Sequence, residues 1–207
     1  MKITAINASP KEQNSMTSGI ISQLERLLPD EVNSCRTGDL KNEADLSSLT
    51  ENDVLIFVFP LYVDSLPASL IELLTRLEKI EKTKKPLIYA VTNCGFYEAQ
   101  QTYLALAMMK CFANKAGLQW GYGLGIGAGP MIQSFGENWQ YRPTALVYQA
   151  LVALAERIKD RKTSDDRYVT VKFSRFLYGL SGNMGWYSLA YRNKTKNLMA
   201  KPHKEGK

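Results

Sequence analysis

Apolar runs alternate along the chain with amphipathic segments, which is the pattern of an α/β protein. Residues 53–59 and 86–91 are nearly unbroken apolar runs, as expected for strands that are covered on both faces of a parallel sheet. Further strands are predicted at residues 2–6 and 118–126, and a weaker one at 31–36. Five strand–helix units predict a parallel sheet with helices on both faces.

The segments between these strands carry leucine and isoleucine at helical spacing. A helix is predicted after residue 16, and another, opened by Pro67, over residues 66–77. A third is predicted over residues 98–116, where Gly117 provides a stop, and a last one over residues 142–159.

A polar segment separates the first strand from the first helix. Its sequence is Asn7-Ala8-Ser9-Pro10-Lys11-Glu12-Gln13-Asn14-Ser15-Met16-Thr17. The first amide groups of a helix lack partners and lie at the positive end of its dipole, so this loop predicts a phosphate site. Hydroxyl groups before a helix are also common N-caps, and capping alone is the alternative explanation.

Two further loops are expected at the same edge of the sheet, because ligands of open α/β sheets bind beyond the carboxyl ends of the strands. One is Pro60-Leu61-Tyr62-Val63-Asp64-Ser65-Leu66-Pro67, and the other is Thr92-Asn93-Cys94-Gly95-Phe96-Tyr97. Both combine aromatic residues with backbone amides, which suits a flat heteroaromatic ring. The three loops together predict a pocket for a phosphorylated, planar cofactor.

The net charge of +6 is distributed unevenly. Residues 1–155 carry 13 Lys and Arg against 15 Asp and Glu, whereas residues 156–207 carry 13 against 5. The part that holds the three loops is therefore close to neutral, and the basicity belongs to the C-terminal segment. We expect no nucleic-acid partner.

The histidine and cysteine content narrows the chemistry. The one histidine, His203, is five residues from the end, which excludes Ser-His-Asp and Cys-His nucleophile systems and histidine-ligated metals. The three cysteines form no C-x-x-C pair, so neither a disulfide framework nor a zinc site is expected. With no signal peptide and no apolar run of ~20 residues, a cytoplasmic protein is expected.

The three loops resemble those of the flavodoxin-like NAD(P)H-dependent FMN reductases and quinone reductases. The first loop resembles their first FMN loop through Asn7-Ala8-Ser9-Pro10-Lys11 and Asn14-Ser15-Met16-Thr17. Pro60-Leu61-Tyr62 with Ser65-Leu66-Pro67-Ala68 is the most specific match, and Thr92-Asn93-Cys94-Gly95 is similar to the third flavin loop. Two positions depart from the family pattern. Ala8 stands where glycine is frequent, and Met16 stands where asparagine is frequent, so a phosphate contact at Met16 should use its backbone amide.

This resemblance implies a flavodoxin-like three-layer α/β sandwich over residues 1–160, with a five-stranded parallel sheet of order 2-1-3-4-5 and a C-terminal extension over residues 161–207. It also implies bound FMN, NADH or NADPH as co-substrate, a small-molecule electron acceptor such as a quinone, and a homodimer. No side chain is expected to act as a catalytic acid or base. The implied cofactor-binding residues are Ser9, Lys11, Asn14, Ser15, Met16, Thr17, Pro60, Leu61, Tyr62, Val63, Asp64, Ser65, Thr92, Asn93, Cys94, Gly95 and Phe96.

Two other classes of protein share parts of this pattern. The string Gly123-Leu124-Gly125-Ile126-Gly127-Ala128 matches G-x-G-x-x-A, but Gly129-Pro130 follows it instead of a helix, so we interpret it as a close-packed strand that leads into a flexible loop. A receiver domain needs acidic residues after the first strand, and Asn7-Ala8-Ser9 provides none. A flavodoxin-type electron carrier without NAD(P)H oxidation is the main rival. The near-neutral charge of the core favours the reductase, because carriers are usually strongly acidic around the flavin.

Several side chains allow two interpretations. Cys94 is either a small structural thiol or a redox-active group. Asp64 either orients the ring or caps the next helix. The aromatic residues in the loops, Tyr62, Phe96 and Tyr97, contact either the flavin or ordinary packing partners. Trp120 and Trp139 cover either the pocket or a subunit contact.

The C-terminal extension contains aromatic residues that are interrupted by glycines. It could pack on a partner subunit, lie over the active site, or rest with its lysines on an anionic membrane surface. A third class of function, a flavin-free interaction protein, would use this basic segment. The final stretch, residues 200–207, is expected to be disordered.

Overall fold

The computed structural model describes residues 1–11 and 13–194. It divides into two units, Met1–Lys172 and Phe173–Lys207. Among the described residues, no helix is long and apolar enough to cross a membrane. Residues 200–207, for which disorder is expected, lie outside the described part of the chain. They include His203.

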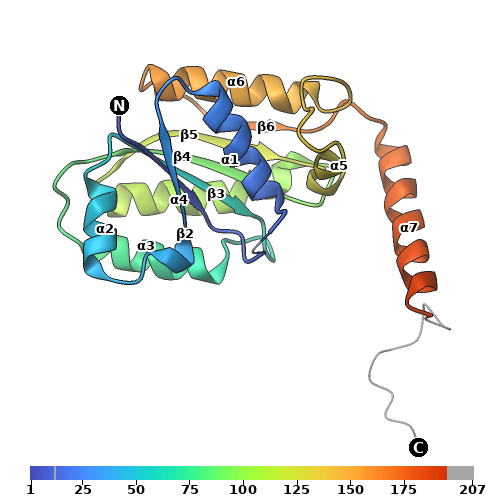
Figure 1. The fold of residues 1–207 in the computed structure, drawn as a ribbon, viewed down its shortest axis with the longest axis horizontal. Coiled ribbons are helices and arrows are strands. Elements are labelled where there is room, and N and C mark those ends of the chain that lie inside the picture. The colour runs from blue at the N-terminus through green and yellow to red at the C-terminus, as the bar shows by residue number, and fades with distance from the viewer. Residues whose placement is uncertain (12, 195–207) are drawn as a thin grey trace, which may run out of the picture. The chain divides into compact units, whose positions relative to one another are not determined.

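The first unit is built on a parallel sheet of six strands in the order β2-β1-β3-β4-β5-β6 (Figure 1). The strands are β1 (Ile3–Asn7), β2 (Val32–Arg36), β3 (Val54–Pro60), β4 (Leu87–Asn93), β5 (Gln119–Ile126) and β6 (Arg167–Val169). The prediction of a parallel α/β sheet is confirmed, and the order of the first five strands agrees with it.

The predicted number of strands was one too low. β6 pairs with residues 124–126 of β5 and lies in the segment that was assigned to the C-terminal extension. It has only three residues and follows the charged Asp165 and Asp166, so it produces no apolar run that a hydrophobic pattern could detect. The compact unit therefore continues to Lys172, beyond residue 160.

Helices cover both faces of the sheet, with α1 and α6 on one face and α2, α3 and α4 on the other (Figure 1). Their bounds are α1 (Met16–Leu27), η1 (Thr37–Asp39), α2 (Glu43–Thr50), α3 (Ala68–Lys79), η2 (Ala99–Thr102), α4 (Tyr103–Lys115), α5 (Gly129–Ser134) and α6 (Ala145–Lys159). The predicted helix over 98–116 starts as the 3-10 helix η2 before α4 begins. The predicted helix over 142–159 starts three residues late, at Ala145. The second unit contains one described helix, α7 (Arg175–Arg192), so α6 is not the last helix of the chain.

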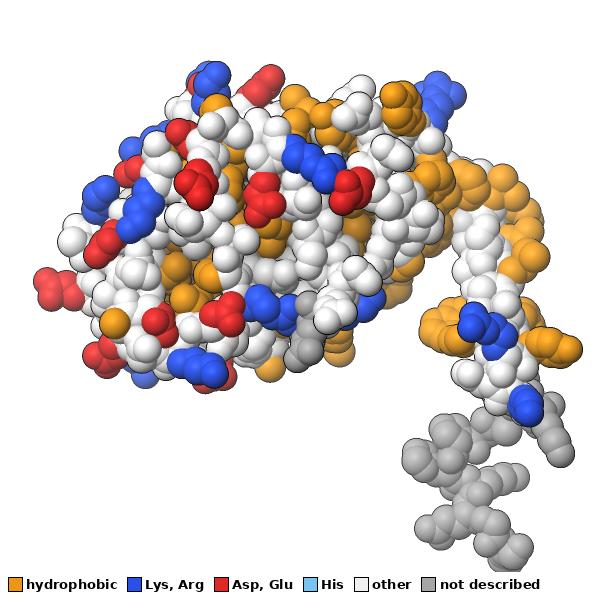
Figure 2. Space-filling view, viewed as in Figure 1, with side chains coloured by type: hydrophobic (Ala, Val, Ile, Leu, Met, Phe, Trp, Pro, Cys, Tyr) orange, Lys and Arg blue, Asp and Glu red, His pale blue; other side chains and the backbone are white. Residues whose placement is uncertain are grey.

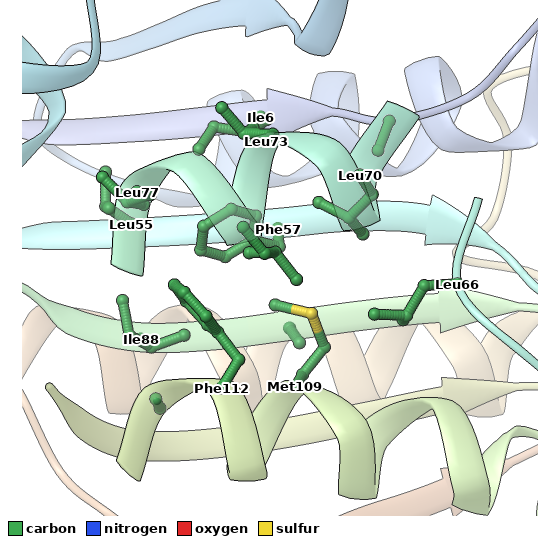
Figure 3. Close-up of a cluster of buried hydrophobic side chains, with 14 of the residues drawn as sticks. Ile6, Leu55, Phe57, Leu66, Leu70, Leu73, Leu77, Ile88, Met109 and Phe112 are labelled. Atoms are coloured by element: carbon green, nitrogen blue, oxygen red, sulfur yellow. The ribbon is translucent and has the colours of Figure 1, made fainter. Parts of the chain in front are cut away.

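The core between the sheet and α3 and α4 fixes the central strands. Phe57 of β3 packs edge-on against Phe112 of α4, with ring centroids 6.3 Å apart and an interplanar angle of 77°. Leucines of α3 and Met109 of α4 close around this pair (Figure 3). Burying such aliphatic and aromatic side chains contributes about 1.5–3 kcal/mol each, and it holds the ends of β3 and β4 in register (Pro60 opposite Asn93).

The glycine string of β5 serves close packing. An added Cβ at Gly125 would collide with the Thr102 hydroxyl and Tyr168, and one at Gly127 would collide with the backbone around Tyr97. The string is therefore part of a strand, as predicted. The predicted flexible loop after it was wrong, because α5 begins at Gly129 with Pro130 in its first turn.

Candidate functional site

The first loop connects β1 to α1 and ends in an N-cap. The Ser15 hydroxyl oxygen accepts a hydrogen bond from the Ser18 N–H (3.0 Å) and lies 2.8 Å from the Ser18 hydroxyl. The amides of Met16 and Thr17, in the first turn of α1, have no carbonyl partner within the helix. They lie at the positive end of its dipole, which is a suitable position for an anion.

The other polar groups of the first loop mainly shape its backbone. The Ser9 hydroxyl oxygen accepts the Lys11 N–H (3.2 Å), and the Asn7 side-chain oxygen accepts the Ser9 N–H (3.0 Å). The Lys11 ammonium donates to the Asn14 carbonyl (3.0 Å), and Asn14 itself has a positive φ of 48°. Lys11 still brings its positive charge to the loop, and Thr17 is buried behind it.

Arg36, at the end of β2, supports this loop and was not predicted from the sequence. Its guanidinium donates to the carbonyl oxygen of Ser9 (3.1 Å) and, at 3.4 Å, to that of Lys11. Arg36 pairs with Asn7 in the parallel register, so the strand end delivers it beside the loop. A basic residue at the end of the strand next to β1 was the available signal.

The second loop turns sharply after β3. Val63 and Asp64 have positive φ values of 46° and 56°, and Tyr62 and Ser65 exchange backbone hydrogen bonds across them (2.8 and 3.1 Å). This turn leaves Val63 and Asp64 exposed, and the Tyr62 side chain is half exposed. The Ser65 hydroxyl lies 3.6 Å from the sulfur of Met108, away from the first loop.

The third loop follows β4 and is tied to both neighbouring loops. The Leu61 N–H donates to the Asn93 carbonyl (2.8 Å), and the Asn93 side-chain amide donates to the Phe59 carbonyl (3.3 Å). The Cys94 N–H donates to the Ile126 carbonyl (2.9 Å), so it does not face a ligand as an open donor. Thr92 is fully buried in β4, and the Phe96 side chain is exposed.

The three loops meet at one cavity of about 200 Å³. It is lined by Met16, Pro60, Leu61, Tyr62, Asn93, Cys94, Gly95, Gly129, Pro130 and Gln133. The first loop contributes Met16, the second and third contribute the next six, and α5 contributes the last three. The structure thus brings residues 16, 60–62 and 93–95 together. Ten predicted residues lie outside the lining, namely Ser9, Lys11, Asn14, Ser15, Thr17, Val63, Asp64, Ser65, Thr92 and Phe96.

The wall provided by α5 was missed in the sequence. The Gln133 side-chain amide donates to the Asn14 carbonyl, which joins α5 to the first loop. The Gly129 N–H donates to the Cys94 carbonyl (2.9 Å), which joins α5 to the third loop. The segment after β5 occupies the same edge of the sheet as the other loops, so its position in the topology was the signal.

A second cavity, of about 290 Å³, lies between α1 and β2. Glu25 and Asp39 are among its lining residues, together with Asn7, Ser18 and Arg36. Carboxylates in the wall disfavour a phosphate, and neither of the other two loops contributes to this cavity. It is therefore a weaker candidate for a phosphorylated ligand than the cavity at the three loops.

Comparison with known proteins identifies the fold. No family model and no curated protein matches the sequence. Solved structures do match: a Fusobacterium nucleatum flavodoxin bound to flavin mononucleotide has 16% identity and a TM-score of 0.56, over 79% of this chain and 100% of that one. The chain has the flavodoxin-like fold.

Two structures named as reductases share this flavodoxin-like fold with similar TM-scores. An NADPH-quinone reductase from P. pentosaceus has 19% identity and a TM-score of 0.55, over 76% of this chain and 97% of that chain. An FMN-dependent NADH-azoreductase from Bacillus anthracis, solved in complex with FMN, has 11% identity and a TM-score of 0.54, over 76% of this chain and 99% of that chain.

Within the flavodoxin-like unit, both tryptophans in question have packing roles. Trp139 is buried and donates its ring N–H to the Gly136 carbonyl (2.6 Å), and its ring lies against Gly19 of α1. Trp120 donates to the Asp166 carboxylate (3.0 Å). Neither lines the cavity at the three loops.

The environment of Cys94 favours a structural thiol. Burial raises the pKa of Cys94, and its sulfur lies 3.7 Å from the Phe96 carbonyl oxygen and 3.8 Å from that of Glu98. A thiol that stays protonated is a poor nucleophile. Cys94 therefore suits a pocket wall better than a redox role.

Cys35 of β2 gives the fold a pH dependence. Burial, and then the Asp39 carboxylate, raises the pKa of Cys35 from 9.0 to about 11. Between these values the unfolded chain releases the thiol proton and the folded chain keeps it, so rising pH favours unfolding. We expect the free energy of unfolding to fall between about pH 9 and pH 11. Urea titrations across this range should show a smaller fall for Cys35→Ser, and an equal fall would contradict the assignment.

Proposed function

We propose that this protein binds FMN non-covalently and is an oxidoreductase that passes electrons from NADH or NADPH to a small acceptor such as a quinone. The cavity at the three loops carries the proposal, because it joins a helix N-terminus to apolar walls at the carboxyl edge of the sheet. Structural neighbours named as an NADPH-quinone reductase and as an FMN-dependent NADH-azoreductase support the class of reaction.

The residues present fit a phosphate at the first loop. The open amides of Met16 and Thr17 supply N–H donors, and the helix dipole supplies positive potential. Lys11 adds a full charge, and Arg36 fixes the loop backbone through its hydrogen bonds to the carbonyls of Ser9 and Lys11. The Ser9 hydroxyl acts as an acceptor within the loop, so its own proton is left for the ligand.

The residues present also fit a flat ring in the cavity. Pro60, Leu61 and Tyr62 form one wall, and Gly129 and Pro130 of α5 contribute to the rest. A volume of about 200 Å³ is below the 300–1,000 Å³ that is common for small-ligand pockets, so only part of a ring is enclosed. The enclosed part is fixed and shielded from water, while the rest stays open to a co-substrate.

The division of labour follows from this geometry. FMN, when bound, supplies the two-electron chemistry between the nicotinamide and the acceptor. The chain positions it: Asn93 is locked by its hydrogen bonds to the Phe59 carbonyl and the Leu61 amide, so the second and third loops cannot shift independently. Leaving one side open lets nicotinamide and acceptor alternate there, which gives ping-pong kinetics.

A flavodoxin-type electron carrier is the second candidate, since a flavodoxin is among the structural neighbours. The cationic groups at the first loop, Lys11 and Arg36, and the near-neutral charge of residues 1–155 favour the reductase. Homodimer formation stays a prediction. Exposed apolar residues on α4, namely Tyr103, Leu104 and Met108, are available for it.

The deciding experiment is steady-state oxidation of NADH and NADPH by the FMN-loaded protein. We expect oxidation to require both FMN and an added acceptor, with a water-soluble quinone, an azo dye and free flavin tried in turn. The apoprotein, and free FMN at equal concentration, are the controls. A yellow protein that oxidises neither nucleotide with any of these acceptors would reject the reductase and leave the electron carrier as the remaining candidate function.

A further inference from the structure

Helix α7 of the second unit carries an apolar face that the flavodoxin-like unit does not explain. Leu177, Leu180, Met184, Tyr187 and Tyr191 follow one another at spacings of three and four residues. At 3.6 residues per turn, this spacing places them on one side of the helix. Phe176 falls on the same side. We call these six residues the apolar face of α7.

No residue of α7 is buried. Of the apolar face, Met184 is 64% exposed and Tyr191 is 87% exposed. Figure 2 shows hydrophobic side chains on the surface of this segment. An exposed apolar face of this length is typical of a helix that has an external binding surface.

The glycines of α7 support the same conclusion. Gly179, Gly182 and Gly185 lie in the helix interior, and an added Cβ would meet nothing within 4 Å at any of them. Packing within the second unit therefore does not require them. Glycine is the weakest helix former after proline, and an isolated helix of this length is only marginally stable in water. An external surface is needed to stabilise α7.

The charge of residues 170–204 indicates the charge of the surface that would bind α7. Residues 170–204 contain seven Lys and Arg and no Asp or Glu. A second copy of this segment would bring like charges together. The complementary surface is anionic.

We propose that α7 lies in the interface of an anionic lipid membrane, with its apolar face toward the acyl chains. Two observations favour lipid over an acidic protein. The face mixes Phe and Tyr with Leu and Met, and tyrosine is enriched at the boundary between headgroups and acyl chains. Arg192 and Lys194 at the end of the helix supply contacts to anionic headgroups.

The chain offers a matched pair of variants for the test. Leu180 is on the apolar face and Leu189 lies nine residues later, on the opposite side of the helix. Their side chains are similarly exposed, at 47% and 46%. Leu180→Gln and Leu189→Gln thus make the same chemical change at two similarly exposed positions on opposite sides of the helix.

The experiment is flotation of the full-length protein with vesicles of phosphatidylcholine, with or without about 30% phosphatidylglycerol. We expect at least about tenfold tighter binding to the anionic vesicles and weaker binding as salt is raised. Leu180→Gln should weaken binding about tenfold and Leu189→Gln less than twofold. The assay contains no nicotinamide nucleotide, so its outcome is independent of the proposed oxidoreductase activity.

Two results would overturn the proposal. One is equal binding of both variants, since the apolar face would then have no role. The other is a lack of binding of the wild-type protein to anionic vesicles. If sedimentation velocity then shows a wild-type oligomer that Leu180→Gln dissociates, the apolar face would be assigned to a second copy of the chain.

Discussion

Ser15→Asp is expected to weaken FMN binding about 100-fold, which corresponds to ~2.7 kcal/mol, while the protein stays folded. Ser15 is the N-cap of α1, and aspartate caps a helix about as well as serine does. The new carboxylate would stand where we place the phosphate, so charge repulsion would replace a neutral contact. Fluorescence quenching of FMN by the apoprotein measures the dissociation constant, and circular dichroism reports the fold.

Ser15→Asn is the matched control, because asparagine caps equally well and has the shape of aspartate without its charge. FMN binding to this variant should stay within a few-fold of wild type. If Ser15→Asp and Ser15→Asn bind FMN alike, the phosphate does not lie at the first turn of α1.

Gly127→Ala should destabilise the protein by about 3 kcal/mol, a large fraction of the stability of a typical domain. An added Cβ would lie 2.9 Å from the Ala99 nitrogen and closer still to the Tyr97 carbonyl oxygen. Both are backbone atoms of a segment that is tied to the residues after β5 by the hydrogen bond from the Ala128 N–H to the Phe96 carbonyl (2.6 Å). Neither can move without disturbing the third loop. Urea unfolding monitored by circular dichroism measures the loss.

The control for this prediction is Gly38→Ala in η1, where an added Cβ meets nothing within 4 Å. Its free energy of unfolding should stay within about 0.5 kcal/mol of wild type. A Gly127→Ala variant as stable as Gly38→Ala would show that Gly127 does not serve close packing.

The central strands could be predicted because their burial is written into their composition. β3 and β4 are covered on both faces, so they appear as continuous apolar runs. β6 and α2 could not be predicted in this way. β6 has three residues at the sheet edge, and in α2 the buried apolar residues are only Leu46 and Leu49. Short elements take their stability from tertiary contacts that a periodicity does not record.

The candidate site also has parts that the hydrophobic pattern predicts and parts that it does not. The cavity is lined by residues 16, 60–62 and 93–95 because the strand order places the three loops at one edge of the sheet. The strand order follows from the pattern of hydrophobic residues along the chain. Arg36 and Gln133 reach the first loop from β2 and α5 through side-chain bonds to backbone carbonyls. Such contacts depend on register and on rotamers, which the sequence pattern does not contain. The sharp turn at Val63 and Asp64, which directs them away from the cavity, is equally local.

Calorimetric titration of the purified apoprotein with FMN tests the central claim most directly, with riboflavin as the partner titration. The three-loop cavity and the α1 N-terminus predict one FMN per chain, bound about 100-fold or more tightly than riboflavin, because riboflavin lacks the phosphate. Absence of heat on adding FMN, or equal affinity for the two flavins, would contradict the account.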